Sequence, residues 1–240
     1  MISLAITSFN RSDLVIESFI QVVDNDFIGE IVIVDDYSDN AIYIKLYNLI
    51  NDLNSDKIKI HRNEANLGPF KNKYEAVKKC SNDWVILLDS DNIIDNSYIE
   101  IVEGLAKEDD IMYIPEILYK KKNKKNISWH YVAFSNLIID KSNIKDYVDV
   151  SYFGAFLNTG NHFFNRNRYM QVIENACNDL SLSINDAIYF SYLWLLSGNR
   201  MKVVPDLYYI HRPSKDSWWV IHSKECMGST FEIIRRIKEW

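Results

Sequence analysis

The sequence is poor in the residues that build disulfide frameworks, zinc sites and glycine-rich phosphate loops. Its three cysteines, Cys80, Cys177 and Cys226, show no CxxC or Cys/His spacing, which argues against disulfides and zinc and favours a reducing cytoplasm. Its seven glycines form neither the GxxxxGK loop of kinases and nucleotide switches nor the GxGxxG turn of dinucleotide dehydrogenases. Those two classes of nucleotide-binding protein are therefore disfavoured.

Long hydrophobic runs and an excess of positive charge are also missing. No window approaches the ~18 to 20 apolar residues of a spanning helix, and the first residues lack the basic and apolar stretches of a secretion signal. The formal net charge of −6 argues against general affinity for nucleic acid, which requires clustered cations. We expect a cytoplasmic protein without a nucleic-acid partner, and leave open peripheral contact with the inner face of a membrane.

The pattern that is present is typical of an α/β domain. The chain has 240 residues, 48% of them hydrophobic and 25% charged, which suffices for a full core. In the first half, short Ile- and Val-rich runs alternate with segments of helical period, which predicts a mostly parallel sheet covered by helices. The expected strands are residues 2–6, 30–34, 57–60 and 84–88, and the expected helices are 13–23, 42–52, 70–79 and 97–106.

The second half predicts a mixed α+β arrangement. Strands are expected at residues 132–139, 162–164 and 202–209, and helices at 168–177 and 185–196. The lysine run between residues 120 and 125 predicts a solvated hairpin tip or loop, with contact to an anionic acceptor or lipid headgroup as the alternative. Without a repeat or linker, we expect one domain over residues 1–240, with halves at 1–110 and 111–240 and a C-terminal helical tail.

Polar residues follow each predicted strand of the first half. They are residues 7–11, Asp35 with Asp36, residues 66–68, and residues 89–91. Parallel strands joined by right-handed crossovers present their carboxyl ends at one edge of the sheet, where ligands of open α/β folds bind. We therefore expect these four segments to meet around one ligand.

The strongest motif is Asp89-Ser90-Asp91 at the end of a buried-looking strand. Side chains two apart on an extended segment point the same way, so Asp89 and Asp91 can converge. Their mutual repulsion would be relieved by a divalent cation, which prefers oxygen ligands. The alternative is a turn or helix cap, for which Asp and Asn are common.

Two further segments are weaker. Asp36 could accept a hydrogen bond from the N–H of a uracil ring or from a ribose hydroxyl. The alternative is that Asp35 or Asp36 caps the next helix. Lys71, which follows Gly68 and Pro69, could contact a base or phosphate, although the segment alone predicts only a good helix N-terminus.

Taken together, these motifs resemble family-2-type glycosyltransferases of the GT-A fold. Residues 7–11 look like the first nucleotide loop of that family, 34–36 like its base-binding acid pair, 66–72 like its glycine segment and 89–91 like its DxD metal motif. The resemblance covers residues 1–100 and, more loosely, 155–215. It implies an α/β GT-A fold, in which a Rossmann-like nucleotide-sugar-binding half (1–110) is fused to a mixed α+β acceptor half (111–240).

The resemblance also implies roles for individual residues. The implied nucleotide-sugar site consists of Thr7, Phe9, Arg11, Asp36, Lys71, Asp89, Ser90 and Asp91. Asp91 would bind Mn²⁺ or Mg²⁺, and Asp89 would contact the ribose or the metal. A late histidine completes the metal shell in several relatives, and His211 is the candidate because imidazole suits Mn²⁺, the alternative being a structural histidine. Arg212 is a candidate for offsetting diphosphate charge.

The catalytic base implied by the resemblance is Asp186. Members of the family carry a Glu-Asp pair at the start of a helix in the second half, and the corresponding pair here is Asn185-Asp186. The alternative reading is a helix N-cap supplied by Ser183, Asn185 or Asp186. The substitution of Asn for Glu also makes an inactive binding module conceivable.

The implied activity is metal-dependent, inverting transfer of a sugar, by default from a UDP-sugar, to a hydroxyl of a glycan, lipid-linked or protein acceptor in glycan or polysaccharide synthesis. The runner-up is a sugar-phosphate nucleotidylyltransferase, although the glycine- and basic-rich loop expected near its start is missing.

The tail, with Trp218, Trp219 and residues 231–240, predicts packing against the core, and a membrane-surface helix or homodimer contact is the alternative.

Overall fold

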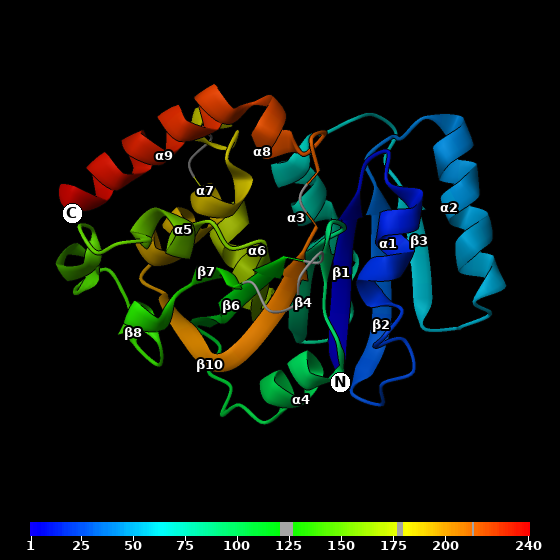
Figure 1. The fold of residues 1–240 in the computed structure, drawn as a ribbon, viewed down its shortest axis with the longest axis horizontal. Helices are drawn as coiled ribbons and strands as arrows, with labels where there is room; N and C mark the ends of the chain where they lie inside the picture. Colours follow the sequence, from blue (N-terminus) through cyan, green and yellow to red (C-terminus); the bar gives the residue numbers. More distant parts are fainter. Residues whose placement is uncertain (121–126, 177–179, 213) are drawn as a thin grey trace.

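A ten-stranded sheet runs through both halves of the protein (Figure 1). The structure, a computed structural model, describes residues 1–120, 127–176, 180–212 and 214–240. The main path of the sheet has the order β3-β2-β1-β4-β9-β6-β10-β5, with β7 beside β6 and β8 beside β10.

The first four strands of the sheet are all parallel. Its strands β1 to β4 pair in parallel with the hydrogen-bonded order β3-β2-β1-β4. The strands are β1 (Ile2–Ser8), β2 (Ile28–Asp35), β3 (Ile58–Arg62) and β4 (Trp84–Asp89), and the helices are α1 (Ser12–Phe19), α2 (Asn40–Asp52), α3 (Pro69–Lys79) and α4 (Asn96–Glu103). All eight predicted elements are present with boundaries shifted by a few residues.

The second half mixes strand directions. Strand β9 is antiparallel to β4 and β6, whereas β10 runs parallel to β6 and antiparallel to β5 and β8. The strands of this half are β6 (Ile111–Lys120), β7 (Ile127–His130), β8 (Ile138–Ile139), β9 (Asn161–Asn165) and β10 (Arg200–His211), and β10 also pairs with β5 (Asn92–Ile93), which precedes residue 110. The predicted fold class is thereby confirmed. Because one sheet continues across residue 110, the division into halves stays a prediction.

The helices of the second half are α5 (Phe153–Leu157), α6 (Arg166–Glu174), α7 (Asp186–Leu196), α8 (Trp218–Ile221) and α9 (Ser223–Lys238), with 3-10 turns at Val132–Phe134, Ile144–Tyr147 and Leu180–Leu182. Helix α6 ends before Cys177, which lies outside the described residues together with most of the lysine run. Strands β6 and β7 pair antiparallel on either side of that run.

One predicted strand is wrong. Residues 132–139 begin with a 3-10 turn, and only Ile138–Ile139 pairs as a strand. The backbone of Asn136 has a φ of 58°, a left-handed conformation that a continuous strand cannot contain. The apolar residues of this segment, including the fully buried Phe134, pack in the core although they belong to a turn. A short apolar run in the sequence does not distinguish such a buried turn from a strand.

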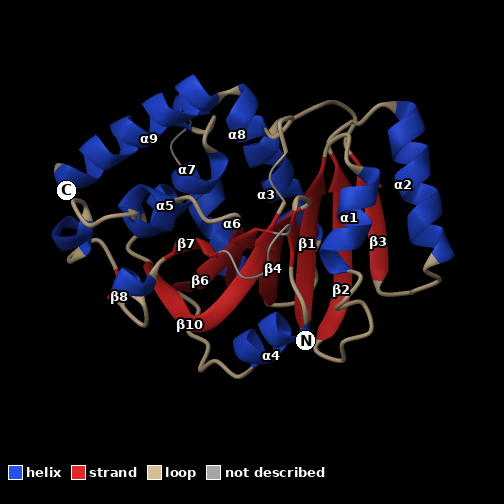
Figure 2. Cartoon of the chain, in the orientation of Figure 1, coloured by secondary structure: helices blue, strands red, loops and turns tan. Residues whose placement is uncertain are grey.

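Helices cover both faces of the sheet (Figure 2). Buried side chains of α1, α2 and α4 pack on one face, and those of α3, α6, α7 and α9 on the other. Every residue from Ala187 to Leu195 in α7 is buried, whereas α9 buries one side through Ile233 and Ile237. The predicted packing of the tail is therefore confirmed for α9, whereas Trp218 and Trp219 of α8 are 37% and 46% exposed. Among the described residues, no helix is both long and apolar enough to cross a bilayer.

A buried carboxylate joins the strands of the first half. Glu30 of β2, whose side chain is 3% exposed, accepts hydrogen bonds from Ser3 Oγ at 2.6 Å, Ser81 Oγ at 2.8 Å and Lys59 Nζ at 2.7 Å. Burial alone would raise the pKa of Glu30, but these donors outweigh it and lower the pKa to about 2. The ionised carboxylate therefore stabilises the fold.

We predict that Glu30→Gln lowers the free energy of unfolding by about 2 kcal/mol at pH 7, because the amide turns a donor toward groups that already donate. The pKa of Glu30 in the folded protein lies below the usual value of 4.5, so its contribution to stability is complete above pH 4.5 and is lost as the pH falls toward 2. Urea unfolding across this range, with exposed Glu100→Gln as control, measures it. A difference in unfolding free energy between the variant and the wild type that stays the same in acid would contradict the prediction.

Candidate active site

A cleft of about 830 Å³ opens where the carboxyl ends of β1, β2, β4 and β10 meet. The residues predicted for the site that line this cleft are Thr7, Phe9, Arg11, Asp36, Asp89, Ser90, Asp91, Asp186 and His211. Lys71 is exposed on α3, and Lys73 lines the cleft in its place. Motifs from both halves of the chain thus face one space.

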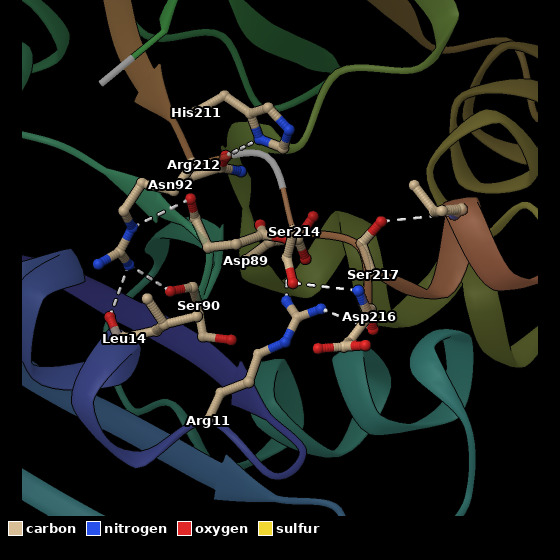
Figure 3. Close-up of polar contacts among 12 residues, drawn as sticks. Arg11, Leu14, Asp89, Ser90, Asn92, His211, Arg212, Ser214, Asp216 and Ser217 are labelled. Carbon is tan, nitrogen blue, oxygen red and sulfur yellow. Dashed lines mark hydrogen bonds and ion pairs between the residues drawn. The ribbon is translucent and has the colours of Figure 1, made fainter. Parts of the chain in front are cut away.

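The second acid of the DxD motif is held by an arginine. Arg11 Nη1 lies 2.9 Å from Asp91 Oδ2, and Arg11 Nη2 donates to the backbone oxygen of Asp216 at 3.3 Å (Figure 3). The side chains of Arg11 and Asp91 are 19% and 10% exposed, so the pair is well shielded from solvent. Asp91 therefore faces a cation rather than capping a helix.

The first acid of the motif shares a lysine with the candidate base. Lys73 Nζ lies 2.8 Å from Asp89 Oδ1 and 2.5 Å from Asp186 Oδ2, and its side chain is only 8% exposed. Burial would lower the pKa of Lys73, but the two carboxylates raise it, so the ammonium stays charged. Burial raises the pKa of Asp89 to about 6 against the opposing effect of Lys73.

Lys73 was missed in the sequence, although a signal for it was present. Phe70, Lys73, Ala76 and Val77 are the buried side of α3, at the i, i+3, i+6 and i+7 spacing of one helix face. A lysine on the apolar stripe of a helix requires a buried counter-charge, because an unpaired buried ammonium is costly. Lys71 lies on the opposite, exposed side.

Asp36 shapes the glycine segment. Its carboxylate accepts hydrogen bonds from the backbone N–H groups of Leu67 and Gly68, both at 2.9 Å, and from Asn63 Nδ2 at 2.8 Å. Gly68 has a φ of 78°, which favours glycine there. Asp39 is the N-cap residue of α2, so the acid pair does not serve as its cap.

The start of α7 is tied to the tail. Asn185 is the N-cap residue, and its side chain donates to Thr230 Oγ1 of α9 at 3.0 Å instead of capping the helix. Ser183 Oγ donates to the oxygen of Leu180 at 2.7 Å, and Asp186 faces Lys73. The capping alternative for these three side chains is therefore wrong, and Asp186 projects into the cleft from the first residue of α7.

His211 and Arg212 have different surroundings. His211 Nδ1 lies 2.9 Å from Asn92 Oδ1, and burial lowers the pKa of His211, although nearby Asp91 raises it. Arg212, 6% exposed, donates to the backbone oxygens of Leu14, Ser90 and Asp91 (Figure 3). Arg212 thus holds the backbone of the DxD motif and is not among the described residues that line the cleft.

The aromatic tail forms one wall of the cleft. Residues 218–222 line it, and Trp218 Nε1 donates to the oxygen of Ile184 at 2.8 Å, just before Asp186. Trp219 and Ile221 remain 46% and 62% exposed. The tail therefore contributes to the site as well as to the core.

Comparisons with solved structures identify the fold. S. aureus TarS 1-349 in complex with UDP matches with a TM-score of 0.65 and 16% identity over 98% of this chain and 64% of that chain. The mannosyltransferase PcManGT from Pyrobaculum calidifontis, in complex with GDP-Man and Mn²⁺, matches with a TM-score of 0.64 and 13% identity, again over 98% and 64%. GalNAc-T7 with UDP, GalNAc and Mn²⁺ matches with a TM-score of 0.65 and 18% identity over 90% of this chain and 44% of that chain.

This chain therefore spans less than two thirds of these structures, and they establish its GT-A fold alone. No curated protein matches the sequence. The model of the family "Glycosyl transferase family 2" matches residues 3–179, which include the DxD motif, Lys73 and the segments around Arg11 and Asp36. The chain belongs to glycosyl transferase family 2.

Proposed function

We propose that the protein transfers a sugar from a nucleotide-sugar donor to an acceptor hydroxyl. The main support for this proposal is that Asp89, Asp91 and Asp186 line one cleft together with the cations Arg11 and Lys73, which pair with them. Membership of glycosyl transferase family 2 supports the reaction class. UDP is proposed as the nucleotide because it accompanies TarS and GalNAc-T7, although PcManGT holds GDP-Man.

A divalent cation fits the donor side of the cleft. Among the described residues, no three His, Cys, Asp or Glu side chains form a ready metal site. Asp91 and His211 both line the cleft, and two protein ligands suffice where phosphates and water complete the shell, as in many magnesium sites. We propose that these two residues hold Mn²⁺ or Mg²⁺, which would stabilise the charge of the leaving diphosphate as a Lewis acid.

The acceptor side is assigned to Asp186. An ionised carboxylate at the first residue of a helix is favoured by the helix dipole and can accept the proton of an attacking hydroxyl. Lys73 Nζ contacts Asp186 Oδ2 at 2.5 Å, so we propose that the donor phosphates draw the ammonium away before proton transfer. Attack from the side of Asp186, opposite the diphosphate, would invert the anomeric carbon.

The finer assignments belong to the same proposal. The acceptor is a glycan, lipid-linked or protein hydroxyl in glycan or polysaccharide synthesis. Thr7, Phe9, Arg11, Asp36 and Ser90 contact the donor, since all five line the cleft. For Lys71, which is exposed, direct contact with the donor is not part of the proposal.

The first test is ligand binding. We expect UDP to raise the melting temperature clearly only when Mn²⁺ or Mg²⁺ is present, because a ligand at about 100 times its dissociation constant adds about 2.7 kcal/mol to the native state. Asp91→Asn should remove most of the metal-dependent increment. Thermal shifts with UDP, GDP and CDP, each with metal and with EDTA, measure this. Equal stabilisation by UDP in EDTA would refute the metal assignment.

The second test addresses chemistry. Asp186→Asn should lower the rate at which UDP is formed from a UDP-sugar by about 10²- to 10⁴-fold, because the amide cannot accept the proton of the acceptor. The affinity for UDP in the presence of metal should change little. Asp52→Asn on the exposed end of α2 is the matched control. Coupled UDP detection and calorimetry supply the two measurements. Full activity in the Asp186 variant would assign the base to another group.

The third test compares two lysines of α3. Lys73→Met should lower the free energy of unfolding by about 3 kcal/mol in EDTA, because it leaves Asp89 and Asp186 without their shared cation. The same change at exposed Lys71 should cost less than about 0.5 kcal/mol. Mn²⁺ should recover part of the loss in the Lys73 variant by replacing the missing positive charge. Equal costs at both positions, measured by urea unfolding, would contradict the central role of Lys73.

A further inference from the structure

Three side chains form a buried polar chain that ends at His211. Asn92 of β5 lies directly opposite His211 in the antiparallel pair with β10. Asn92 Oδ1 is 2.9 Å from His211 Nδ1, and Asn92 Nδ2 donates to Asn161 Oδ1 at 3.2 Å (Figure 3 shows Asn92 and His211). Asn92 and Asn161 are 2% and 0% exposed, so solvent does not compete for these bonds.

Gly160 makes room for the amide of Asn92. A Cβ atom at Gly160 would lie 2.5 Å from Asn92 Nδ2 and 3.2 Å from Asp89 Oδ2. The amide nitrogen of Asn92 and the carboxylate of Asp89 therefore border the same space. This neighbourhood favours the orientation in which the NH₂ group faces the carboxylate side and Asn161, because the reverse orientation would turn the amide oxygen toward a carboxylate.

The orientation of this amide determines the proton position on His211. An amide oxygen only accepts hydrogen bonds, so its partner Nδ1 must carry the hydrogen in the neutral imidazole. Nε2 then keeps its lone pair. Free histidine in water prefers the opposite tautomer, so the buried amide imposes a choice that the side chain would not make alone.

We propose that Asn92 is a positioning residue that fixes His211 as the Nδ1–H tautomer and so presents the Nε2 lone pair to the donor site. The carboxylate of Asp89 beside the space at Gly160 sets this orientation, and Asn161 Oδ1 accepts from the NH₂ group that results. The use of Nε2 as a metal ligand rests on the function proposed above, whereas the tautomer itself does not. Partners that orient ligating histidines are worth about tenfold to 100-fold in metal affinity.

The test reads the tautomer directly. Long-range ¹H–¹⁵N correlation spectra of unliganded protein at pH 8, assigned by the loss of one histidine in His211→Asn, should show His211 protonated at Nδ1. Asn92→Asp should keep this tautomer, because carboxylate oxygens also accept. Asn92→Leu and Gly160→Ala should shift His211 toward the Nε2–H form, while Asn96→Leu on the exposed start of α4 should not.

A wild-type His211 protonated at Nε2 would overturn the proposal, as would an unchanged tautomer in Asn92→Leu. If the Leu variant does not fold, the wild-type and Asn92→Asp spectra still decide. Calorimetry then measures the affinity for Mn²⁺ in the presence of UDP, which we expect to fall about tenfold to 100-fold in Asn92→Leu. Wild-type protein that shows the Nδ1–H tautomer but binds no metal with UDP would refute the proposed metal assignment and leave the effect of Asn92 on the tautomer intact.

Discussion

The ammonium of Lys73 between Asp89 and Asp186 is the interaction on which the site depends. Carboxylates gathered in a shielded cleft repel one another, and this cost must be met when no ligand is bound. Here each acid of the DxD motif contacts a cation: Asp89 contacts Lys73, which it shares with Asp186, and Asp91 contacts Arg11. Lys73 also joins α3 and β4 of the first half to α7 of the second, so it balances the charge of the cleft and adds one contact to the shared sheet that connects the halves.

The sheet explains why these groups meet. Parallel pairing of β1, β2 and β4 places Arg11, Asp36 and Asp89 at neighbouring strand ends. Strand β10 then returns beside β5 and brings His211 opposite Asn92, within the reach of the same cleft. Arg212, the next residue, fastens the backbone of Ser90 and Asp91 to that of Leu14, so the DxD turn is held from behind. A cation expected to face a ligand thus serves to fix the loop that faces it.

The sequence could predict the part of this arrangement that depends on local pattern. The strands and helices of residues 1–100 follow from hydrophobic period, and the motifs at their ends follow from the parallel topology. Long-range partners could not be read in this way. Nothing local pairs Lys73 with Asp186, more than a hundred residues away, or shows that Asn92 faces His211. The strand predicted over residues 132–139 is wrong for most of its length, because burial against other elements, rather than strand pairing, accounts for residues such as Phe134.

Asn185, which stands where the resemblance implies a glutamate, gains a structural meaning from its contact with the tail. Asn185 donates to Thr230, Ser229 Oγ donates to the oxygen of Leu182, and Trp218 Nε1 donates to the oxygen of Ile184. With the contact of Cys226 Sγ to the oxygen of Ile184, the turn that leads into α7 is therefore held from four residues of α8 and α9. A glutamate at residue 185 could accept from Thr230 but could not donate to it, and it would add a fourth carboxylate beside Asp89, Asp91 and Asp186. A neutral amide makes the contact with the tail without further charge, so Lys73 remains sufficient to balance the acids that face it.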